Sequence, residues 1–405
     1  DLVRSRGLGD VYKRQVKYTD TERTPAERAR ALLEEMTLDE KMAQLGCIFP
    51  FGDSYDDMEQ QALEMPYGIG QVSTLEMRRI GTLEEAAGWQ RKMQETVMRQ
   101  SPHHIPAIFH MEGLCGAFIQ EGTSFPSGIA RGSGWDPELE EKIAKVVAKQ
   151  EAACGITHIL APVLDISRDS RMGRQGETYG EDPALAAALG AAYTKGIQTT
   201  EAGGRRPESV AKHFLGFHNS QGGIHGTNSD TPSRLMEEIY GKPFQSAISE
   251  SELKGVMPCY NSIDGEPASV SHRLLTELLR EKMGFDGLCV SDYGGINNAH
   301  EVQRIGETIG ETGLLAMEAG MDIEMPKATG YGEELKEMFR SGQADTELLD
   351  RTVLRVLEAK FRMGLFEHPF AMDGESCQKI FEEKEGAELS FRSARESMVC
   401  LLYTS

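Results

Sequence analysis

The chain has 405 residues and an acidic balance, with 43 Lys and Arg against 64 Asp and Glu, for a net charge of −21. Nucleic-acid binders need clustered basic residues, so this balance argues against a nucleic-acid partner. No apolar run reaches the roughly 20 residues that cross a bilayer, so we expect no membrane partner. The seven cysteines form no C-x-x-C pair, which argues against a disulfide framework or a zinc site and favours a reducing, cytoplasmic location.

The two ends of the sequence differ in pattern from the rest. Residues 1–16 and 400–405 show no periodicity that connects them with their neighbours, and they resemble translated adapter sequence. We therefore predict that both segments are non-native and that the natural ends of the protein lie outside this chain. Between them we predict one domain over residues 17–370, followed over residues 371–399 by a linker and a helix.

Short apolar runs of strand length alternate with helical patterns along residues 17–370. Eight runs have this character: Leu45–Phe49, Gly70–Ser73, Ala107–His110, His158–Leu164, Ser209–Phe214, Gly255–Tyr260, Gly287–Ser291 and Met321–Met325. Near-continuous apolar strands that alternate with helices indicate a parallel sheet covered on both faces. Eight such units over roughly 300 residues fit a closed barrel. The predicted fold class is therefore α/β, a (β/α)8 TIM-type barrel with extra N- and C-terminal helices.

Helix starts can be placed from capping residues. We expect helices to begin at five positions. A Thr-Pro or Asp-Pro pair marks three of them, at Thr24-Pro25, Asp136-Pro137 and Asp182-Pro183, and a capping box marks the other two, at Thr37 with Glu40 and Thr82 with Glu85. Outside the barrel units we expect helices over Glu347–Met363 and Ala387–Met398. The polar segment Ala371–Gly386 is expected to be a loop.

Polar side chains follow five consecutive predicted strands, from the third to the seventh. They are Glu112, Asp165, the pair Lys212-His213, the pair Tyr260-Asn261, and Asp292. Because the carboxyl ends of barrel strands emerge at one face, we expect these side chains to gather around one mouth. A lone Asp292 could merely cap the next helix. Five consecutive strand ends of this kind favour a catalytic or binding face instead.

The composition of this mouth suits a neutral, polyhydroxylated ligand. Carboxylates accept hydrogen bonds from sugar hydroxyls, Arg and Lys donate to sugar oxygens, and each charged hydrogen bond contributes roughly 1.5–3 kcal/mol. Carboxylates are also the groups that glycosyl transfer needs. The histidines show no metal-ligand spacing and the glycines no phosphate-binding pattern, so we predict neither a metal nor another cofactor.

Five motifs together resemble the N-terminal barrel domain of glycoside hydrolase family 3, the group of β-glucosidases and β-xylosidases. They are H-M-E-G-L-C-G (110–116), P-V-L-D-I-S-R-D-S-R-M-G-R-Q-G-E-T-Y-G-E-D-P (162–183), A-K-H-F (211–214), M-P-C-Y-N (257–261) and G-F-D-G-L-C-V-S-D-Y (284–293). Three positions depart from the family pattern. Cys115 replaces a usual His, Met172 a usual Trp, and Tyr293 a frequent Trp.

The resemblance implies a role for each residue of the mouth. Asp292 would be the nucleophile, with Tyr260 beside it. The sugar would be bound by a set of polar and aromatic side chains, namely Glu112, Asp165, Arg174, Lys212, His213 and Tyr293.

The resemblance also implies a retaining, exo-acting β-glycosidase that hydrolyses β-linked oligosaccharides or aryl glycosides from the non-reducing end. Two-domain relatives take the acid–base Glu from a following α/β sandwich domain, and we expect that domain to be the missing partner of this chain. Glu266 and Glu324 are candidates within the chain, but each is more typical of an ordinary loop.

Two alternatives stay open at this point. The barrel could bind sugar without catalysis. It could also be a single-domain β-N-acetylhexosaminidase, a group that resembles the same family and uses a His–Asp dyad after the fifth strand. That loop contains His218, His225 and Asp230, but it lacks the compact G-H-G-x-x-x-x-D-x-H pattern.

Overall fold

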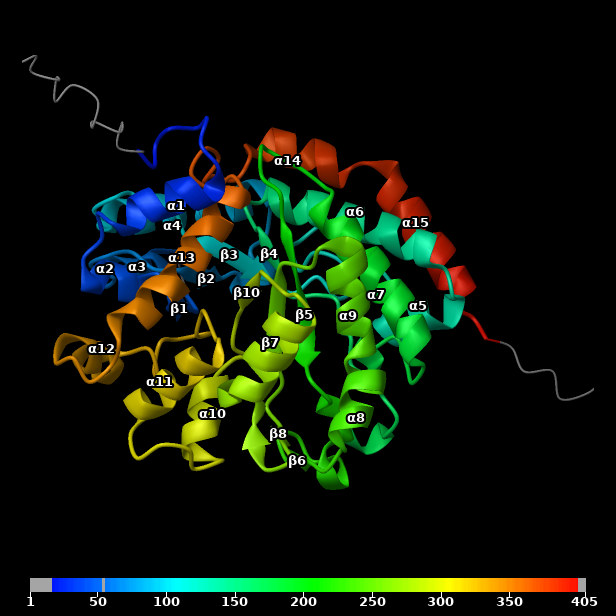
Figure 1. Ribbon diagram of the computed structural model, residues 1–405. Helices are drawn as coiled ribbons and strands as arrows, with labels where there is room; N and C mark the ends of the chain where they lie inside the picture. The colour runs from blue at the N-terminus through cyan, green and yellow to red at the C-terminus, as the bar shows by residue number, and fades with distance from the viewer. Residues whose placement is uncertain (1–16, 53–54, 400–405) are drawn as a thin grey trace, which may run out of the picture.

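Parallel strands form the centre of the protein (Figure 1). The computed structural model describes residues 17–52 and 55–399, so the two predicted non-native ends lie outside the described residues. Its seven-stranded sheet has the order β1-β2-β3-β4-β5-β7-β10, and every neighbouring pair is parallel. The strands are β1 (Cys47–Ile48), β2 (Gln71–Ser73), β3 (Ile108–Met111), β4 (His158–Ile159), β5 (Glu208–Phe214), β7 (Gly255–Pro258) and β10 (Leu288–Cys289).

An eighth segment closes the sheet into a barrel. Ile323 pairs with Val290 in an isolated parallel bridge next to β10. On the other side, the backbone N–H of Glu324 donates to the carbonyl of Leu45, at 3.0 Å, just before β1. The predicted α/β barrel is therefore confirmed. Its eighth run, Met321–Met325, makes several backbone hydrogen bonds with the segment 289–294 but a single one with Leu45, so it does not form a regular strand on both sides.

Helices surround these strands (Figure 1). They are α1 (Pro25–Leu33), α2 (Leu38–Ala43), α3 (Tyr55–Leu63), α4 (Leu83–Gln100), α5 (Gly128–Gly134), α6 (Pro137–Ala153), α7 (Pro183–Gln198), α8 (Ser233–Leu235), α9 (Lys242–Ser251), α10 (Gly295–Glu301), α11 (Ile309–Ala319), α12 (Glu333–Arg340) and α13 (Thr346–Arg362). Strand residues such as Val210, Val256 and Leu288 are buried, since helices cover a parallel sheet on its outer face.

The caps predicted for these helices are present. Thr37 and Glu40 form a complete capping box at the start of α2, and Thr24 begins α1 in the same way. Asp136 and Asp182 accept backbone hydrogen bonds at the starts of α6 and α7. These helix starts could be predicted from the sequence because a cap depends on a few neighbouring residues and not on the rest of the fold.

The prediction of a loop over Ala371–Gly386 is wrong. α14 (Gly374–Phe381) occupies the middle of this segment, and α15 (Lys384–Glu396) begins soon after it. Asp373 caps α14, whose apolar residues Cys377 and Phe381 lie one turn apart and are buried. Tertiary packing of one apolar face can stabilise a short helix whose sequence is otherwise polar. Figure 1 shows α14 and α15 on the outside of the barrel near α6.

A small second sheet lies beyond the carboxyl ends of β5 and β7. It consists of β6 (Asn228–Ser229), β8 (Ser262–Ile263) and β9 (Glu266–Pro267) (Figure 1). In the loop before β6, Gly223 has φ +69°, and a Cβ there would approach Arg171 Cβ to 2.5 Å. The loop after β5 therefore packs closely on the loop after β4. Because β4 and β5 are parallel neighbours in the sheet, their carboxyl ends lie together at the same face, below these two loops.

The capping box of α2 gives a stability prediction. Replacing Thr37 with Ala should lower the free energy of unfolding by about 1 kcal/mol, because the N–H of Glu40 loses its side-chain acceptor. Urea unfolding of both proteins measures the difference. Thr199→Ala is the matched control, since its hydroxyl only contacts a carbonyl of its own helix, α7. Equal losses in the two variants would contradict the capping account.

Candidate active site

Asp292 follows β10 at the carboxyl-end face of the barrel. Its Oδ1 accepts a hydrogen bond from the backbone N–H of Tyr293, at 2.7 Å. Its Oδ2 is buried and has no hydrogen-bond partner among residues 17–52 and 55–399, although His213 Nε2 lies 3.7 Å away. The next helix, α10, begins after Gly294 without a side-chain cap, so Asp292 does not serve as a helix cap. One carboxylate oxygen is thus held, and the other is left for a further partner.

Asp165, His213 and Arg174 form a chain of hydrogen bonds beside Asp292. Asp165 Oδ2 accepts from His213 Nδ1, at 2.7 Å, and from the backbone N–H of His213, at 3.3 Å. Arg174 Nη2 lies 3.3 Å from His213 Nε2. Because a guanidinium can only donate, Nε2 must accept, and His213 is a neutral imidazole with its proton on Nδ1.

Burial controls the protonation of this pair. It raises the pKa of Asp165 to about 6 and lowers the pKa of His213 well below its ordinary value. The two hydrogen bonds that Asp165 accepts favour its ionised form over its protonated form. The bond donated by Arg174 to His213 Nε2 requires that His213 be neutral. Near neutral pH, this part of the mouth therefore holds a carboxylate, a neutral imidazole and a guanidinium.

Arg174 is fixed by two further contacts. Glu177 accepts from Arg174 Nε at 2.7 Å and from Nη2 at 2.8 Å. Burial raises the pKa of Glu177, but the pairing with Arg174 outweighs it, and the net effect is a lowered pKa. The guanidinium also lies over the ring of Phe217, 5.1 Å from its centre, in cation–π geometry. The position of the Arg174 cation is therefore determined from three sides.

Lys212 and Glu112 form a second charged pair in the mouth. Lys212 Nζ lies 2.5 Å from Glu112 Oε2, and the exposed fractions of the two side chains are 4% and 23%. A buried ammonium needs such a partner, because an unpaired charge in the interior is strongly unfavourable. Lys212 is therefore held inside the barrel, while Glu112 reaches the accessible surface of the mouth.

Tyr260 and Tyr293 connect the mouth to the barrel interior. Tyr260 donates its hydroxyl to the carbonyl of Tyr293, at 2.7 Å. Burial and then the charge of Asp292 raise the pKa of Tyr260. The Tyr293 hydroxyl points inward and lies 2.7 Å from both Ser73 Oγ and His110 Nε2. The predicted role of Tyr293 as a platform for sugar stays a prediction.

The structure brings the predicted site residues into one cluster, and it adds others. Ser73 and His110 contact Tyr293, while the rings of Phe217 and His225 pack at a tilt against Tyr260, with the ring centres of His225 and Tyr260 4.9 Å apart. Ser73 and His110 do end the second and third predicted strands, so their positions were visible in the sequence. Their contact with Tyr293 was not, because Tyr293 follows a distant strand, β10.

The acidic residues considered as in-chain acids serve other purposes. Glu324 is buried, and its oxygens accept backbone N–H groups of Thr329, Gly330 and Tyr331 at 2.8–3.0 Å. Glu266 is the first residue of β9, and its Oε2 lies 3.7 Å from Arg273 Nε. The Glu324 carboxylate therefore supports local loop structure, and the partly exposed Glu266 carboxylate faces Arg273.

The loop proposed for a His–Asp dyad has a different arrangement. Asp230 accepts hydrogen bonds from Gln221 and Asn228. His225 instead packs against the rings of Phe217 and Tyr260. The N-acetylhexosaminidase alternative is therefore not favoured.

The described part of the chain lacks two further features. It contains no group of three or more His, Cys, Asp or Glu side chains that could hold a metal ion. None of its helices is long and apolar enough to cross a membrane.

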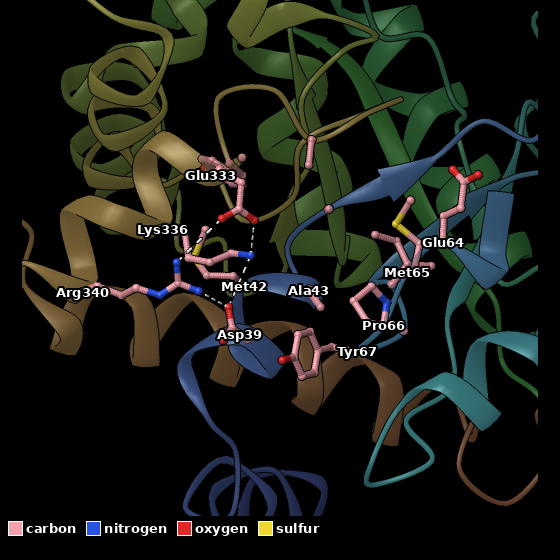
Figure 2. A pocket seen from close by; sticks show the side chains of 16 residues that line it. Asp39, Met42, Ala43, Glu64, Met65, Pro66, Tyr67, Glu333, Lys336 and Arg340 are labelled. Carbon is pink, nitrogen blue, oxygen red and sulfur yellow. Dashed lines mark hydrogen bonds and ion pairs between the residues drawn. The ribbon is translucent and has the colours of Figure 1, made fainter.

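A pocket of about 550 Å³ lies outside the barrel, between α2, α12 and the segment before β2 (Figure 2). Four of its charged side chains, Asp39, Glu333, Lys336 and Arg340, pair with one another. Asp39 accepts from Arg340 at 2.6 Å, and Lys336 lies 2.5 Å from Glu333. The pocket shares no residue with the Asp292 cluster, so we do not place the active site there.

Comparison with known proteins identifies the family. Residues 37–359 match the glycosyl hydrolase family 3 N terminal domain. The chain belongs to this family. The match covers all of the strands and every residue predicted for the mouth, from Glu112 to Tyr293.

Relatives within family 3 carry two kinds of name. A beta-xylosidase from Formosa agariphila is 32% identical over 313 residues, which is 73% of this chain and 43% of that protein. The periplasmic beta-glucosidase of Salmonella typhimurium is 29% identical and covers 91% of this chain and 47% of its own length. The chain thus spans less than half the length of these two relatives.

Solved structures of family 3 proteins share the fold. A β-glucosidase from Erythrobacter marinus superimposes with a TM-score of 0.88 at 31% identity, covering 94% of this chain and 51% of that one. The β-glucosidase from Listeria innocua, in complex with glucose, has a TM-score of 0.81 at 29% identity over 92% of this chain and 51% of that one. The described barrel therefore corresponds to about half of each of these proteins.

Buried histidines in the barrel give a pH prediction. Burial lowers the pKa of His158 to about 3, whereas an unfolded histidine titrates near 6.5. Between these values the unfolded state binds a proton that the folded state does not, so the free energy of unfolding falls as pH falls. His158→Gln should reduce that slope by up to about 1.4 kcal/mol per pH unit.

Urea unfolding at several pH values between 6.5 and 4 measures this slope. His272→Gln is the control, because His272 is exposed on the surface. An unchanged slope in His158→Gln, or an equal change in both variants, would contradict the assignment of a neutral buried imidazole.

Proposed function

We propose that the full protein is a retaining, exo-acting β-glycosidase and that this chain carries its nucleophile, Asp292. The observation that carries the proposal is the state of the carboxylate. Oδ1 is held by the N–H of Tyr293, while buried Oδ2 has no hydrogen-bond partner in the described chain. An oriented carboxylate with one free oxygen is what attack on an anomeric carbon requires.

The surrounding groups fit the same reaction. In a retaining mechanism the nucleophile forms a covalent glycosyl-enzyme, which water then hydrolyses. Asp165, Arg174, Lys212 and Glu112 present charged donors and acceptors that suit hydroxyl groups of a sugar ring. Their positions are already fixed by pairing, so little reorganisation is needed when a sugar binds.

The acid–base group is proposed to lie outside this chain, on the α/β sandwich domain expected to follow. Retaining enzymes place their two carboxyl groups about 5–5.5 Å apart. Asp165 has a raised pKa, but its side chain is 1% exposed and bonded to His213, so it cannot reach a leaving group. The relatives are about twice as long as this chain, which leaves room for a second domain.

The substrate is proposed to be a β-linked glucoside or xyloside. The relatives named above include both beta-glucosidase and beta-xylosidase. Structures of the Listeria innocua relative hold glucose and, in a mutant, laminaribiose.

Trapping the glycosyl-enzyme tests the proposal. A 2-deoxy-2-fluoro glucoside or xyloside with a dinitrophenyl leaving group needs no proton to depart, so this chain alone should form an adduct on Asp292. Intact mass measurement detects the adduct, and peptide mapping locates it. The sugar that reacts faster identifies the preferred substrate.

Asp292→Asn is the control and should form no adduct. An unmodified wild-type protein that still binds monosaccharide would indicate a sugar-binding barrel without catalysis. An adduct on another carboxylate would contradict the assignment of the nucleophile.

The Lys212–Glu112 pair gives a second prediction. Lys212→Met should slow adduct formation by about 10- to 100-fold, since one charged hydrogen bond contributes roughly 1.5–3 kcal/mol. Lys195→Met is the matched control, because Lys195 is a largely exposed lysine on α7 that pairs with Glu141. Adduct rates that differ by less than twofold between the two variants would remove Lys212 from the sugar site.

A further inference from the structure

Tyr293 is bonded through its backbone and its side chain at the same time. Its N–H donates to Asp292 Oδ1, its carbonyl accepts from the Tyr260 hydroxyl, and each bond is 2.7 Å long. The orientation of Tyr293 thus determines where the N–H that holds the carboxylate points. Whatever fixes the side chain of Tyr293 also fixes Asp292.

The side chain of Tyr293 is fixed from two neighbouring strands, β2 and β3. Its hydroxyl lies 2.7 Å from Ser73 Oγ and 2.7 Å from His110 Nε2. Ser73 and His110 are register partners in the sheet, and both are buried. β10 is not a sheet neighbour of either strand. The phenol therefore connects the segment after β10, which carries Asp292, with two strands elsewhere in the barrel.

The hydrogens of this contact can be assigned from the bonding pattern. His110 Nδ1 is buried without a partner in the described chain. An unpaired lone pair is tolerated better than an unpaired N–H, so the proton of the neutral ring belongs on Nε2. Nε2–H then donates to the phenol oxygen of Tyr293, and the phenol donates to Ser73 Oγ. Both bonds are satisfied in this arrangement.

His110 stays neutral under the conditions in which glycosidases work. Burial, followed by the neighbouring His158 ring and the charge of Lys212, lowers the pKa of His110 to about 3. The carbonyl of His110 also accepts from both the N–H and the hydroxyl of Thr74, at 3.0 and 2.7 Å. The imidazole is thus held in place and does not change charge as the pH varies above 4.

We propose that His110, together with Ser73, is a positioning residue for the nucleophile. His110 holds the Tyr293 phenol, Tyr293 holds Asp292 Oδ1, and Oδ2 is thereby directed to the anomeric carbon. The inference rests on the proposed function, because it concerns the rate of attack by Asp292. It adds a requirement for two buried residues that touch neither the sugar nor the reacting atoms.

A purely structural role for His110 predicts a different outcome, and His158 offers a matched comparison. His158 is the register partner of His110 on β4 and is equally buried, with its pKa also lowered to about 3 by burial. It contacts Gln71 rather than Tyr293, with its Nδ1 3.1 Å from Gln71 Nε2. Replacing either histidine perturbs the same part of the barrel interior, but only the replacement of His110 removes a hydrogen bond to the Tyr293 hydroxyl.

The experiment measures adduct formation with the 2-deoxy-2-fluoro aryl glycoside and separates the maximal rate from the half-saturating concentration. His110→Phe should lower the maximal rate about 10- to 100-fold, the scale of a small misalignment of reacting groups. The half-saturating concentration should change little, because the charged pairs proposed to bind the sugar hydroxyls, Lys212–Glu112 and Arg174–Glu177, are not altered. His158→Phe should stay within twofold of wild type in both quantities.

Two further variants address folding and coupling. His110→Gln, whose amide can bond the phenol, should recover most of the rate, and it decides the matter if His110→Phe does not fold. In a Tyr293→Phe background, His110→Phe should cause no additional loss, because the bond it removes is already absent.

Equal losses in the His110→Phe and His158→Phe variants would overturn the inference, as would a loss confined to the half-saturating concentration. Fully additive losses with Tyr293→Phe would also overturn it. A wild-type protein that forms no adduct would instead overturn the proposed function, and the inference with it.

Discussion

The hydrogen bond from the Tyr293 N–H to Asp292 Oδ1 is the contact on which the account of the site depends. A carboxylate at the end of a strand can rotate and can be solvated on both oxygens. Here one oxygen is occupied at 2.7 Å and the other is buried without a protein partner in the described chain. The energetic cost of an unpaired buried acceptor is acceptable when a ligand atom completes the site.

Charge pairing explains how so many ionic groups can share one buried mouth. Asp165 accepts from neutral His213, Arg174 donates to the same ring, and Arg174 pairs with Glu177, so each of these charged groups has a hydrogen-bond partner. Lys212 and Glu112 form a second pair. Fixed, paired charges form a polar environment that needs little rearrangement during the reaction. The same pairing makes the mouth sensitive to single substitutions, because removing one partner leaves the other charge unpaired.

The sequence predicted those features of the fold that depend on local patterns. The alternation of apolar runs and helices predicted the barrel, and the capping residues predicted the starts of α2, α6 and α7. Residues at the carboxyl ends of strands, such as Asp165 and Asp292, could be assigned to one face because parallel strands share a direction.

Features that depend on contacts between distant segments could not be predicted in this way. α14 is stabilised by burial of Cys377 and Phe381 against the barrel, which its polar sequence does not reveal. His110 was recognised as a histidine near a strand end, but its contact with Tyr293 crosses 183 positions of sequence. The small sheet β6–β8–β9 likewise joins segments that follow two different strands.

A crystal structure of the trapped 2-fluoro glycosyl-enzyme would test the central claim most directly. The account predicts a covalent bond from Asp292 Oδ2 to the anomeric carbon, with Oδ1 still within hydrogen-bond distance of the Tyr293 N–H. It also predicts that the Tyr293 hydroxyl remains on Ser73 and His110. A sugar bound through Oδ1, or attached to any other residue, would contradict the account.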